Sequence, residues 1–135
     1  LFERIKQLAP HTKQFFHSCG NIRPLIPDYI EIGAEALNPV HIRARGMDPA
    51  ALKRDFGADV AFWGGAVDTQ DVLPYGTPQQ VRDDVRRNLD ALAPGGGYVF
   101  NTVHNIQADV PPANILALWE ALHAFNVGDA EGKPL

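Results

Sequence analysis

The stretch DPAALKRDFGADVAFWGG, residues 48–65, carries the pattern on which the fold depends. Asp48 followed by Pro49 is a favourable start for a helix, and Gly57 is a favourable stop. The run 59–63 is short, apolar and rich in residues that favour strands, and it ends at a pair of glycines. The stretch therefore predicts one helix followed by one strand, joined by a tight turn.

The same alternation extends over the rest of the chain. Thr77, Pro78 and Gln80 form a capping box that predicts another helix start. The apolar residues Ile115, Leu116, Trp119 and Leu122 are predicted to form the inward stripe of the last helix. The elements predicted in this way are helices at residues 1–8, 22–33, 49–56, 78–92 and 111–127, and strands at residues 13–17, 34–40, 59–63 and 98–101.

Strands that alternate with helices indicate an α/β fold with a parallel sheet and right-handed crossovers. Two architectures fit this order: an open doubly wound sheet, or four βα units of a (β/α)8 barrel. The sequence pattern alone does not choose between them.

Composition excludes several classes of protein. The 135 residues are 45% hydrophobic and 21% charged, which is typical of a globular chain and not of a disordered one. No apolar run approaches the roughly 20 residues that span a membrane, so no membrane association is expected. A net charge of −4 argues against a nucleic-acid partner. The single cysteine, Cys19, fits a reducing compartment and predicts a cytoplasmic location.

The chain opens at Leu1 without a methionine and enters its first predicted helix at once. The simplest interpretation is a piece that begins inside a larger protein. Residues 1–127 would form part of one domain, and residues 128–135 a polar tail. The missing N-terminal half of the domain is then the first expected partner, and the 135-residue chain alone is expected to be inactive. Its unpaired strand edges would favour self-association, so a homodimer is a further expectation.

Polar side chains follow every predicted strand at the point where the strand ends. They are His17 and Cys19, then Asn38 and His41, then Asp68, and finally Asn101, His104 and Asn105. In both candidate architectures, ligands bind at the carboxyl ends of parallel strands. The sequence therefore predicts a binding or catalytic site at this edge of the sheet.

His17 and Cys19 are two metal-capable side chains at a spacing that points both to the same side of an extended chain. Imidazole and thiolate suit Zn²⁺, and a catalytic zinc keeps three protein ligands and one open position. His104 is the best third ligand, since it projects from the end of the last strand. The alternative is that His17 is a hydrogen-bonded strand-end residue and Cys19 a small buried hydrophobe.

The other polar residues each allow two interpretations. His41 stands beside two arginines and is a candidate for binding an anionic substrate, or it lies in a solvated loop. Asp68 follows a glycine-rich turn and would position substrate or cap that turn. Asn101 and Asn105 are candidate substrate contacts, or they satisfy the loop backbone.

Several motifs occur together in one order, and together they resemble a known family. They are FHSCGN at 16–21, NPV at 38–40, GMDP at 46–49, FWGGAVD at 62–68, GTP at 76–78, GGYVFNTVHNI at 96–106 and VPPANI at 110–115. In this order the chain resembles the C-terminal portion of the uroporphyrinogen decarboxylase superfamily over residues 1–125. The resemblance implies that the predicted strands are the last four of a (β/α)8 barrel, which makes the chain its C-terminal half.

The resemblance implies two different activities. True decarboxylases of the family remove acetate carboxylates from a tetrapyrrole without metal or cofactor, whereas corrinoid-linked methyltransferases use zinc to activate a thiol that accepts a methyl group. The segment from His17 to Gly20 resembles the zinc motif of the methyltransferases. These usually carry a cysteine where this chain has His104, and a histidine there resembles the decarboxylases instead.

The first hypothesis is a zinc-dependent, corrinoid-linked methyltransferase. His17, Cys19 and His104 would hold the zinc, and the partners would be a small-molecule methyl acceptor and a corrinoid protein. Asp68 and His104 are its predicted catalytic residues, and the predicted substrate contacts are His41, Asn101 and Asn105. The alternative is a cofactor-free uroporphyrinogen decarboxylase of porphyrin biosynthesis, with a tetrapyrrole as substrate. A second alternative is a relative that binds a tetrapyrrole or corrinoid without catalysis.

Overall fold

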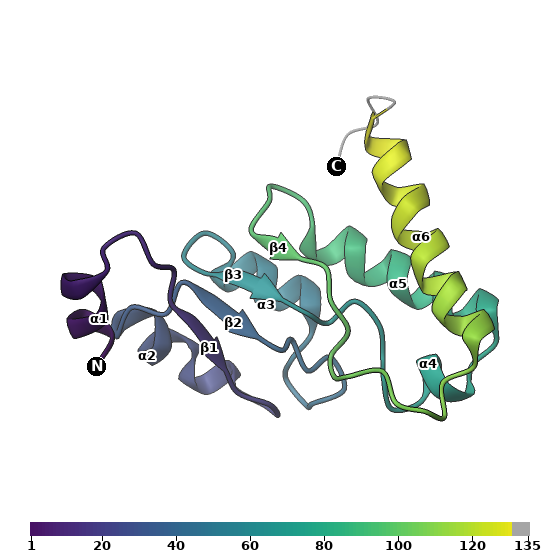
Figure 1. The fold of residues 1–135 in the computed structure, drawn as a ribbon, viewed down its shortest axis with the longest axis horizontal. Coiled ribbons are helices and arrows are strands. Elements are labelled where there is room, and N and C mark those ends of the chain that lie inside the picture. Colours follow the sequence, from purple (N-terminus) through teal and green to yellow (C-terminus); the bar gives the residue numbers. More distant parts are fainter. Residues whose placement is uncertain (131–135) are drawn as a thin grey trace.

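The computed structural model describes residues 1–130, which form helices that alternate with four short strands (Figure 1). The bounds are α1 Phe2–Leu8, β1 Phe15–His17, a 3-10 turn Arg23–Leu25, α2 Ile26–Glu31, β2 Ala36–Asn38, α3 Pro49–Phe56, β3 Ala61–Trp63, α4 Val72–Tyr75, α5 Pro78–Leu92, β4 Tyr98–Val99 and α6 Pro112–Ala130. Every strand expected from the sequence is present, although each is shorter than its apolar run.

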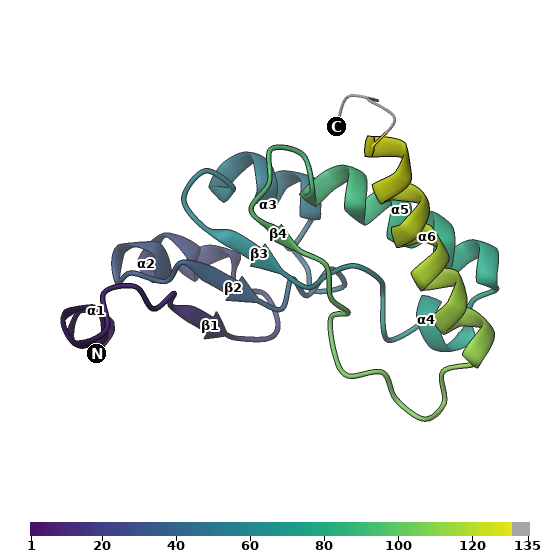
Figure 2. The ribbon, with the colours of Figure 1, turned by 45° about the horizontal axis from the view of Figure 1, so that its top comes forward.

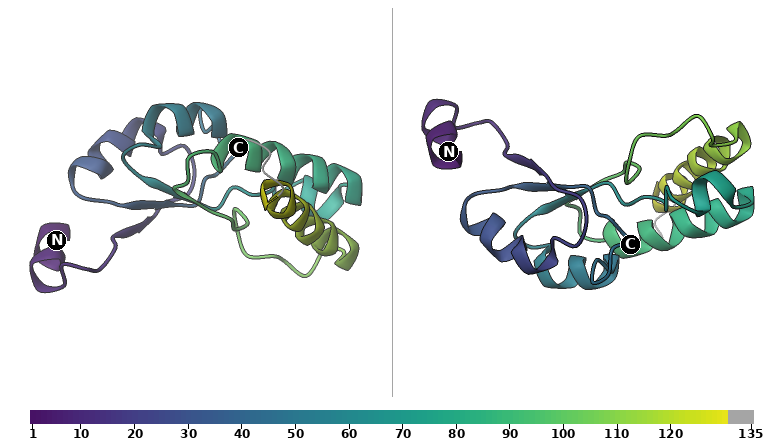
Figure 3. Two further views of the ribbon diagram at one scale, coloured as in Figure 1. Left: turned by 90° about the horizontal axis from the view of Figure 1, so that it is seen from above. Right: turned by 90° about the horizontal axis from the view of Figure 1, so that it is seen from below.

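The four strands are all parallel and lie side by side in chain order, β1-β2-β3-β4 (Figures 1 and 2). Helices α2, α3 and α5 follow one another along one side of this sheet (Figure 3). Right-handed crossovers that always step in the same direction place the helices that connect successive strands on the same face. A doubly wound sheet reverses direction and carries helices on both faces. The observed order is therefore that of half a (β/α)8 barrel.

The two faces of the sheet differ in burial. Leu37 and Phe62 are paired in register, point toward the helices and are each 1% exposed. Phe15 and Trp63 are exposed, and their rings meet edge to face at 5.0 Å between centroids. Since side chains alternate across a strand, this second row forms the opposite face, which a barrel turns toward its interior.

Local capping chemistry explains where the helices begin. The carboxylate of Asp48 accepts a hydrogen bond from the backbone of Ala51 at 2.8 Å. The backbone N–H of Thr77 donates to the side chain of Gln80 at 2.8 Å, and the Thr77 hydroxyl accepts from the Gln80 backbone at 3.3 Å. Both predicted helix starts are confirmed, and each satisfies donors that the first turn of a helix leaves without partners.

A short helix, α4, was not anticipated from the sequence. It lies between β3 and α5, and its four residues are too few to show a periodic pattern. Asn114 of α6 is buried and donates from Nδ2 to the carbonyls of Leu73 and Gly76, each at 2.8 Å. Two hydrogen bonds between uncharged groups therefore attach α4 to the distant helix α6. The local sequence around α4 does not reveal these contacts.

The predicted inward stripe of the last helix is wrong for three of its four residues, since Ile115 is 37% exposed and Leu116 and Trp119 are more exposed still. Leu116 and Trp119 of α6 are about three-fifths exposed, whereas Ala117, Ala121 and Phe125 are buried against α5. The helix is apolar around most of its circumference, so two stripes compete for the core. Small residues allow close approach to α5, and the smaller stripe is the one that packs.

Helix α6 continues through Gly128 to Ala130, so it includes the first three residues of the predicted polar tail. The remainder of that tail, residues 131–135, lies outside the described residues. Among residues 1–130, no helix combines the length and the apolar character that crossing a membrane requires.

At the amino end of β2, Glu35 accepts hydrogen bonds from Lys13 at 2.8 Å and from the backbone of Gln14 at 3.0 Å, and pairs with Lys6 at 2.5 Å. The two lysines, Lys13 first, together with this backbone N–H lower the pKa of Glu35 from 4.5 to about 2. A depressed carboxyl pKa stabilises the folded state above the unfolded pKa, and this contribution disappears as the pH falls.

Glu35→Gln is therefore expected to reduce the free energy of unfolding at pH 7, with the difference shrinking below pH 4.5 and disappearing only below pH 2. Urea denaturation of both proteins across this range measures the difference. A difference that is the same at all pH values would show that the carboxylate charge is not its source.

Candidate functional site

The carboxyl ends of the strands carry two adjoining cavities, of about 300 and 260 Å³. The larger is lined by Cys19, His41, Thr69, Gln70, Val103, His104, Asn105 and Gln107. The smaller is lined by His17, Cys19, Asn38, Asn101, Thr102, Val103, His104 and Asn105. Six of the seven predicted site residues thus gather at one place, as the position of polar residues at strand ends predicts.

The His17 and Cys19 side chains do point to the same side, as their spacing predicts. Nε2 of His17 lies 3.6 Å from Sγ of Cys19, and both residues are exposed. Nδ1 of His17 is 2.6 Å from Oδ1 of Asn38. The parallel register places His17 directly beside Asn38, which explains this second contact. The imidazole is therefore held between an amide and a thiol.

Asn38 ends β2 and is a residue to which sequence reasoning gave no role beyond its place at a strand end. It is 8% exposed, and its Nδ2 donates to the carbonyl of Trp63 on β3 at 3.0 Å. Its own carbonyl accepts from the backbone of Ser18 at 2.7 Å. Asn38 therefore connects three strands at the base of the smaller cavity. Only the register of the paired strands reveals this role of Asn38, and register is a property of the folded sheet that the sequence does not show.

His41 contributes to the larger cavity from the loop after β2. Its Nδ1 accepts a hydrogen bond from the backbone N–H of Gly20 at 3.0 Å. The neighbouring Arg43 turns away from the cavity and pairs with Asp68 and Asp71. The expected grouping of His41 with arginines around an anion is not what the structure shows.

His104 lines both cavities from the segment that follows β4. Its Nδ1 is 3.4 Å from the carbonyl of Asn105, and its own carbonyl accepts from the Thr102 hydroxyl at 2.5 Å. Over residues 1–130, no three histidine, cysteine or acidic side chains lie close enough together to hold a metal ion. The structure therefore brings His104 into the same cavity as the His17–Cys19 pair without assembling a three-ligand set.

Asp68 is the predicted site residue that the structure places elsewhere. One oxygen of its carboxylate accepts from the backbones of Gln70 and Asp71, at 2.8 and 3.2 Å. The other accepts from Arg43 at 3.0 Å. Asp68 lines neither of the two cavities described above. Its carboxylate caps the turn that follows β3, which is the alternative that the glycine-rich sequence left open.

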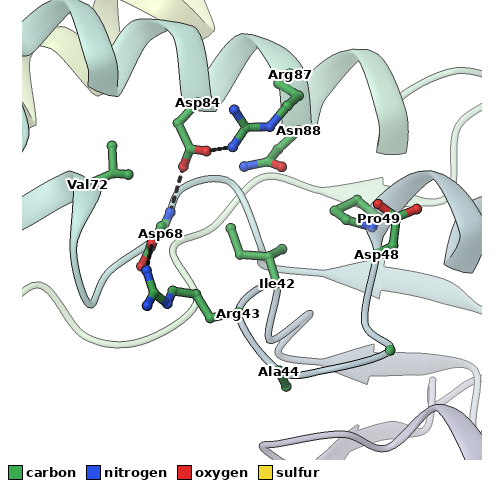
Figure 4. A pocket seen from close by; sticks show the side chains of 11 residues that line it. Ile42, Arg43, Ala44, Asp48, Pro49, Asp68, Val72, Asp84, Arg87 and Asn88 are labelled. Atoms are coloured by element: carbon green, nitrogen blue, oxygen red, sulfur yellow. Dashed lines mark hydrogen bonds and ion pairs between the residues drawn. The ribbon is translucent and has the colours of Figure 1, made fainter.

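Behind this turn lies a separate cavity of about 510 Å³ that contains a network of charged side chains (Figure 4). Asp84 of α5 is buried and accepts from the backbone of Asp68 at 2.8 Å. Burial raises the pKa of Asp84, and this effect outweighs the Asp68 N–H and the nearby Arg87, both of which lower it. Arg87 pairs with Asp84, and Arg43 pairs with Asp68. The network joins α5 to the loops that carry His41 and Gln70.

Asp68→Asn is expected to lower the free energy of unfolding by about 1 kcal/mol, because an amide oxygen still accepts from Gln70 and Asp71 while the charge facing Arg43 is lost. Asp68→Ala removes every acceptor and is expected to cost about 1–3 kcal/mol. Urea denaturation compares the two variants. A large loss of activity in Asp68→Asn at unchanged stability would restore a catalytic role for this carboxylate.

Comparison with known proteins identifies the family. The family model for uroporphyrinogen decarboxylase (URO-D) matches residues 1–125. The chain is 39% identical over 79 residues to uroporphyrinogen decarboxylase from Sodalis glossinidius, covering 58% of this chain and 22% of that protein. It is 36% identical over 100 residues to the enzyme of that name from Pseudomonas aeruginosa, covering 71% and 25%.

A third relative, uroporphyrinogen decarboxylase from Pseudoalteromonas translucida, is 35% identical over 94 residues, which cover 63% of this chain and 26% of that protein. The matched region thus spans about a quarter of the length of these curated relatives. Since the family model covers most of the chain, and the strand order is that of half a barrel, the chain belongs to the uroporphyrinogen decarboxylase family.

Proposed function

We propose that the full-length protein decarboxylates a tetrapyrrole of the uroporphyrinogen type and needs no metal ion for this reaction. The observation that carries the proposal is the larger cavity, where His41 and His104 meet amide side chains in a chain whose relatives bear the name of that enzyme. The rest of the barrel would supply further contacts and would cover the face that exposes Phe15 and Trp63.

Decarboxylation of an acetate arm breaks the bond between the methylene carbon and the carboxylate. Carbon dioxide leaves, the electron pair stays on the remaining carbon, and a proton must be delivered to that carbon to give a methyl group. An imidazole suits this task because its pKa lies near neutral pH. We assign proton delivery to His104, which is exposed and lines both cavities.

His41 would bind rather than protonate the substrate. The backbone N–H of Gly20 donates to its Nδ1, so the proton of the neutral ring lies on Nε2. That N–H is then available to a carboxylate oxygen of the substrate. Gln70, Asn105 and Gln107 line the same cavity and offer further amide donors. Neutral donors hold the carboxylate without the full positive charge of an ion pair, which would stabilise the carboxylate and oppose loss of carbon dioxide.

Incubation of the full-length protein with uroporphyrinogen tests this proposal directly. The expected result is a series of products with progressively fewer carboxylates, ending at coproporphyrinogen, when the mixture is separated chromatographically. Heat-inactivated protein serves as the control. Recovery of unchanged substrate from folded protein would reject the proposal.

A second candidate function is zinc-dependent methyl transfer to a thiol, and the geometry of the His17–Cys19 pair favours it. Zinc–sulfur and zinc–nitrogen bonds of about 2.3 and 2.0 Å at a tetrahedral angle place the two ligand atoms roughly 3.5 Å apart. Nε2 of His17 and Sγ of Cys19 are 3.6 Å apart, so two ligands fit. His104, which shares both cavities with Cys19, is the side chain that would supply the third.

Zinc bound there would act as a Lewis acid that lowers the pKa of a thiol bound to it. A corrinoid protein would then be the partner that carries the methyl group. The relatives described above are all named as decarboxylases, which is why this function ranks second. Zinc content of full-length wild type and Cys19→Ser tests it: one equivalent, lost in the variant, supports methyl transfer, and metal-free wild type rejects it.

A further inference from the structure

The amide of Asn38 has only one orientation that satisfies its surroundings. The carbonyl of Trp63 can only accept a hydrogen bond, so the atom 3.0 Å from it must be the donor Nδ2. The remaining atom, Oδ1, therefore faces His17. Because Asn38 is 8% exposed, water does not readily replace either contact.

This orientation determines where the proton of His17 lies. Oδ1 of Asn38 can only accept, and it is 2.6 Å from Nδ1 of His17, so Nδ1 carries the proton. A neutral imidazole has one N–H, so Nε2 keeps its lone pair. Nε2 is the atom that lies 3.6 Å from the Cys19 sulfur.

We propose that Asn38 is a positioning residue, which selects the Nδ1–H tautomer of His17 and aims the Nε2 lone pair at Cys19. The inference rests on the geometry of this pair and not on either proposed function. A divalent cation with nitrogen and sulfur ligands needs such a lone pair next to a thiol. The same lone pair can instead accept the proton of the thiol. Asn38 thereby determines which chemistry the pair can perform.

Among the residues that the structure describes, no other side chain competes with Asn38 for this role. Within residues 1–130, Asn38 and Cys19 are the hydrogen-bond partners of its ring. The hydrogen bond from the Ser18 backbone to the Asn38 carbonyl, at 2.7 Å, keeps the two strands in the register that places the side chains opposite each other. The exposed ring of His17 would otherwise be free to turn and exchange its proton with water.

Nitrogen NMR of the full-length protein with ¹⁵N-labelled histidine tests the proposal. Long-range ¹⁵N–¹H correlations show which ring nitrogen carries the proton once the ring is neutral, at about pH 8.5, roughly two units above the ordinary histidine pKa. Metal is first removed with a chelator, and the His17 signal is assigned by its loss in His17→Gln. We expect Nδ1–H at His17 and the opposite tautomer, Nε2–H, at His41, which serves as an internal reference.

Two substitutions at Asn38 separate positioning from general structural damage. Asn38→Asp keeps an acceptor for Nδ1 but loses the donor to Trp63, and it is expected to keep the Nδ1–H tautomer. Asn38→Leu removes both contacts and is expected to shift His17 to a majority of Nε2–H. Asn101→Leu, which removes another amide from the same cavity, should give the wild-type spectrum.

The wild-type spectrum alone can overturn the proposal, so the test does not depend on whether Asn38→Leu folds. Nε2–H at His17 in wild type would show that Asn38 does not select the tautomer. An unchanged Nδ1–H signal in folded Asn38→Leu would lead to the same conclusion. Neither outcome bears on uroporphyrinogen turnover, so the proposal and the proposed function fail independently.

Discussion

Phe62→Ala is expected to lower the free energy of unfolding of the full-length protein by about 3–5 kcal/mol. Phe62 lies in β3, in register with Leu37 on one side and Tyr98 on the other. It is 1% exposed and belongs to the cluster that packs the sheet against the helices. Truncation removes buried apolar surface and leaves a cavity that short, hydrogen-bonded strands cannot close.

Chemical denaturation of wild type and Phe62→Ala measures this loss. Tyr75→Ala is a matched control, because Tyr75 is also aromatic but is 74% exposed, with one 3.3 Å hydrogen bond to Asp109. Its expected change is within about 0.5 kcal/mol. A loss below 1 kcal/mol for Phe62→Ala would contradict the arrangement in which β3 is central to the core.

His104→Ala is expected to reduce kcat for uroporphyrinogen decarboxylation by about 10²–10⁴-fold, which is the usual contribution of a positioned general acid. His104 is exposed, so stability should change little. Chromatographic assay of the carboxylate products at saturating substrate gives kcat. Partial recovery of activity on addition of free imidazole would identify proton delivery as the missing step.

Cys19→Ser is the matched control for this prediction, because Cys19 lines both cavities beside His104 and serine is nearly the same size. Metal-free decarboxylation predicts activity within a few-fold of wild type for Cys19→Ser. Equal and large losses in Cys19→Ser and His104→Ala would indicate instead that the two side chains act together, as ligands of a metal ion would.

Features that depend on a few neighbouring residues were predictable from the sequence. Asp48 with Pro49, and Thr77 with Gln80, fix their helix starts through contacts within one turn. Pro24 and Pro27 also act locally: where the sequence pattern predicted one helix at residues 22–33, the structure has a 3-10 turn followed by the six-residue α2. Local steric and hydrogen-bonding rules suffice in all these cases.

Features that depend on distant contacts were not predictable. Helix α4 is held by Asn114, which is 38 or more residues away from the carbonyls it contacts. The burial of α6 was assigned to the wrong stripe because Trp119 is the more hydrophobic choice, whereas the packing surface of α5 accepts Ala117 and Ala121. Sequence periodicity cannot rank two apolar stripes on one helix.

The candidate site shows the same division. Polar residues at strand ends located the site, because all strands of a parallel sheet end at one edge. The sequence did not predict in which direction each of these side chains points once its strand has ended. Asp68 turns back to cap its own loop, and Asn38, which received no specific role, holds His17. Register and turn geometry decide both outcomes, and these emerge only when the strands pair.

Turnover by metal-stripped full-length protein is the most direct test of the central claim, which is metal-independent decarboxylation at the cavity of His41 and His104. After exhaustive treatment with a chelator, zinc content and formation of coproporphyrinogen are measured in the same sample. The predicted result is undiminished product formation with no zinc remaining. The contradicting result is no product from folded protein, together with one equivalent of zinc in untreated wild type that Cys19→Ser fails to bind.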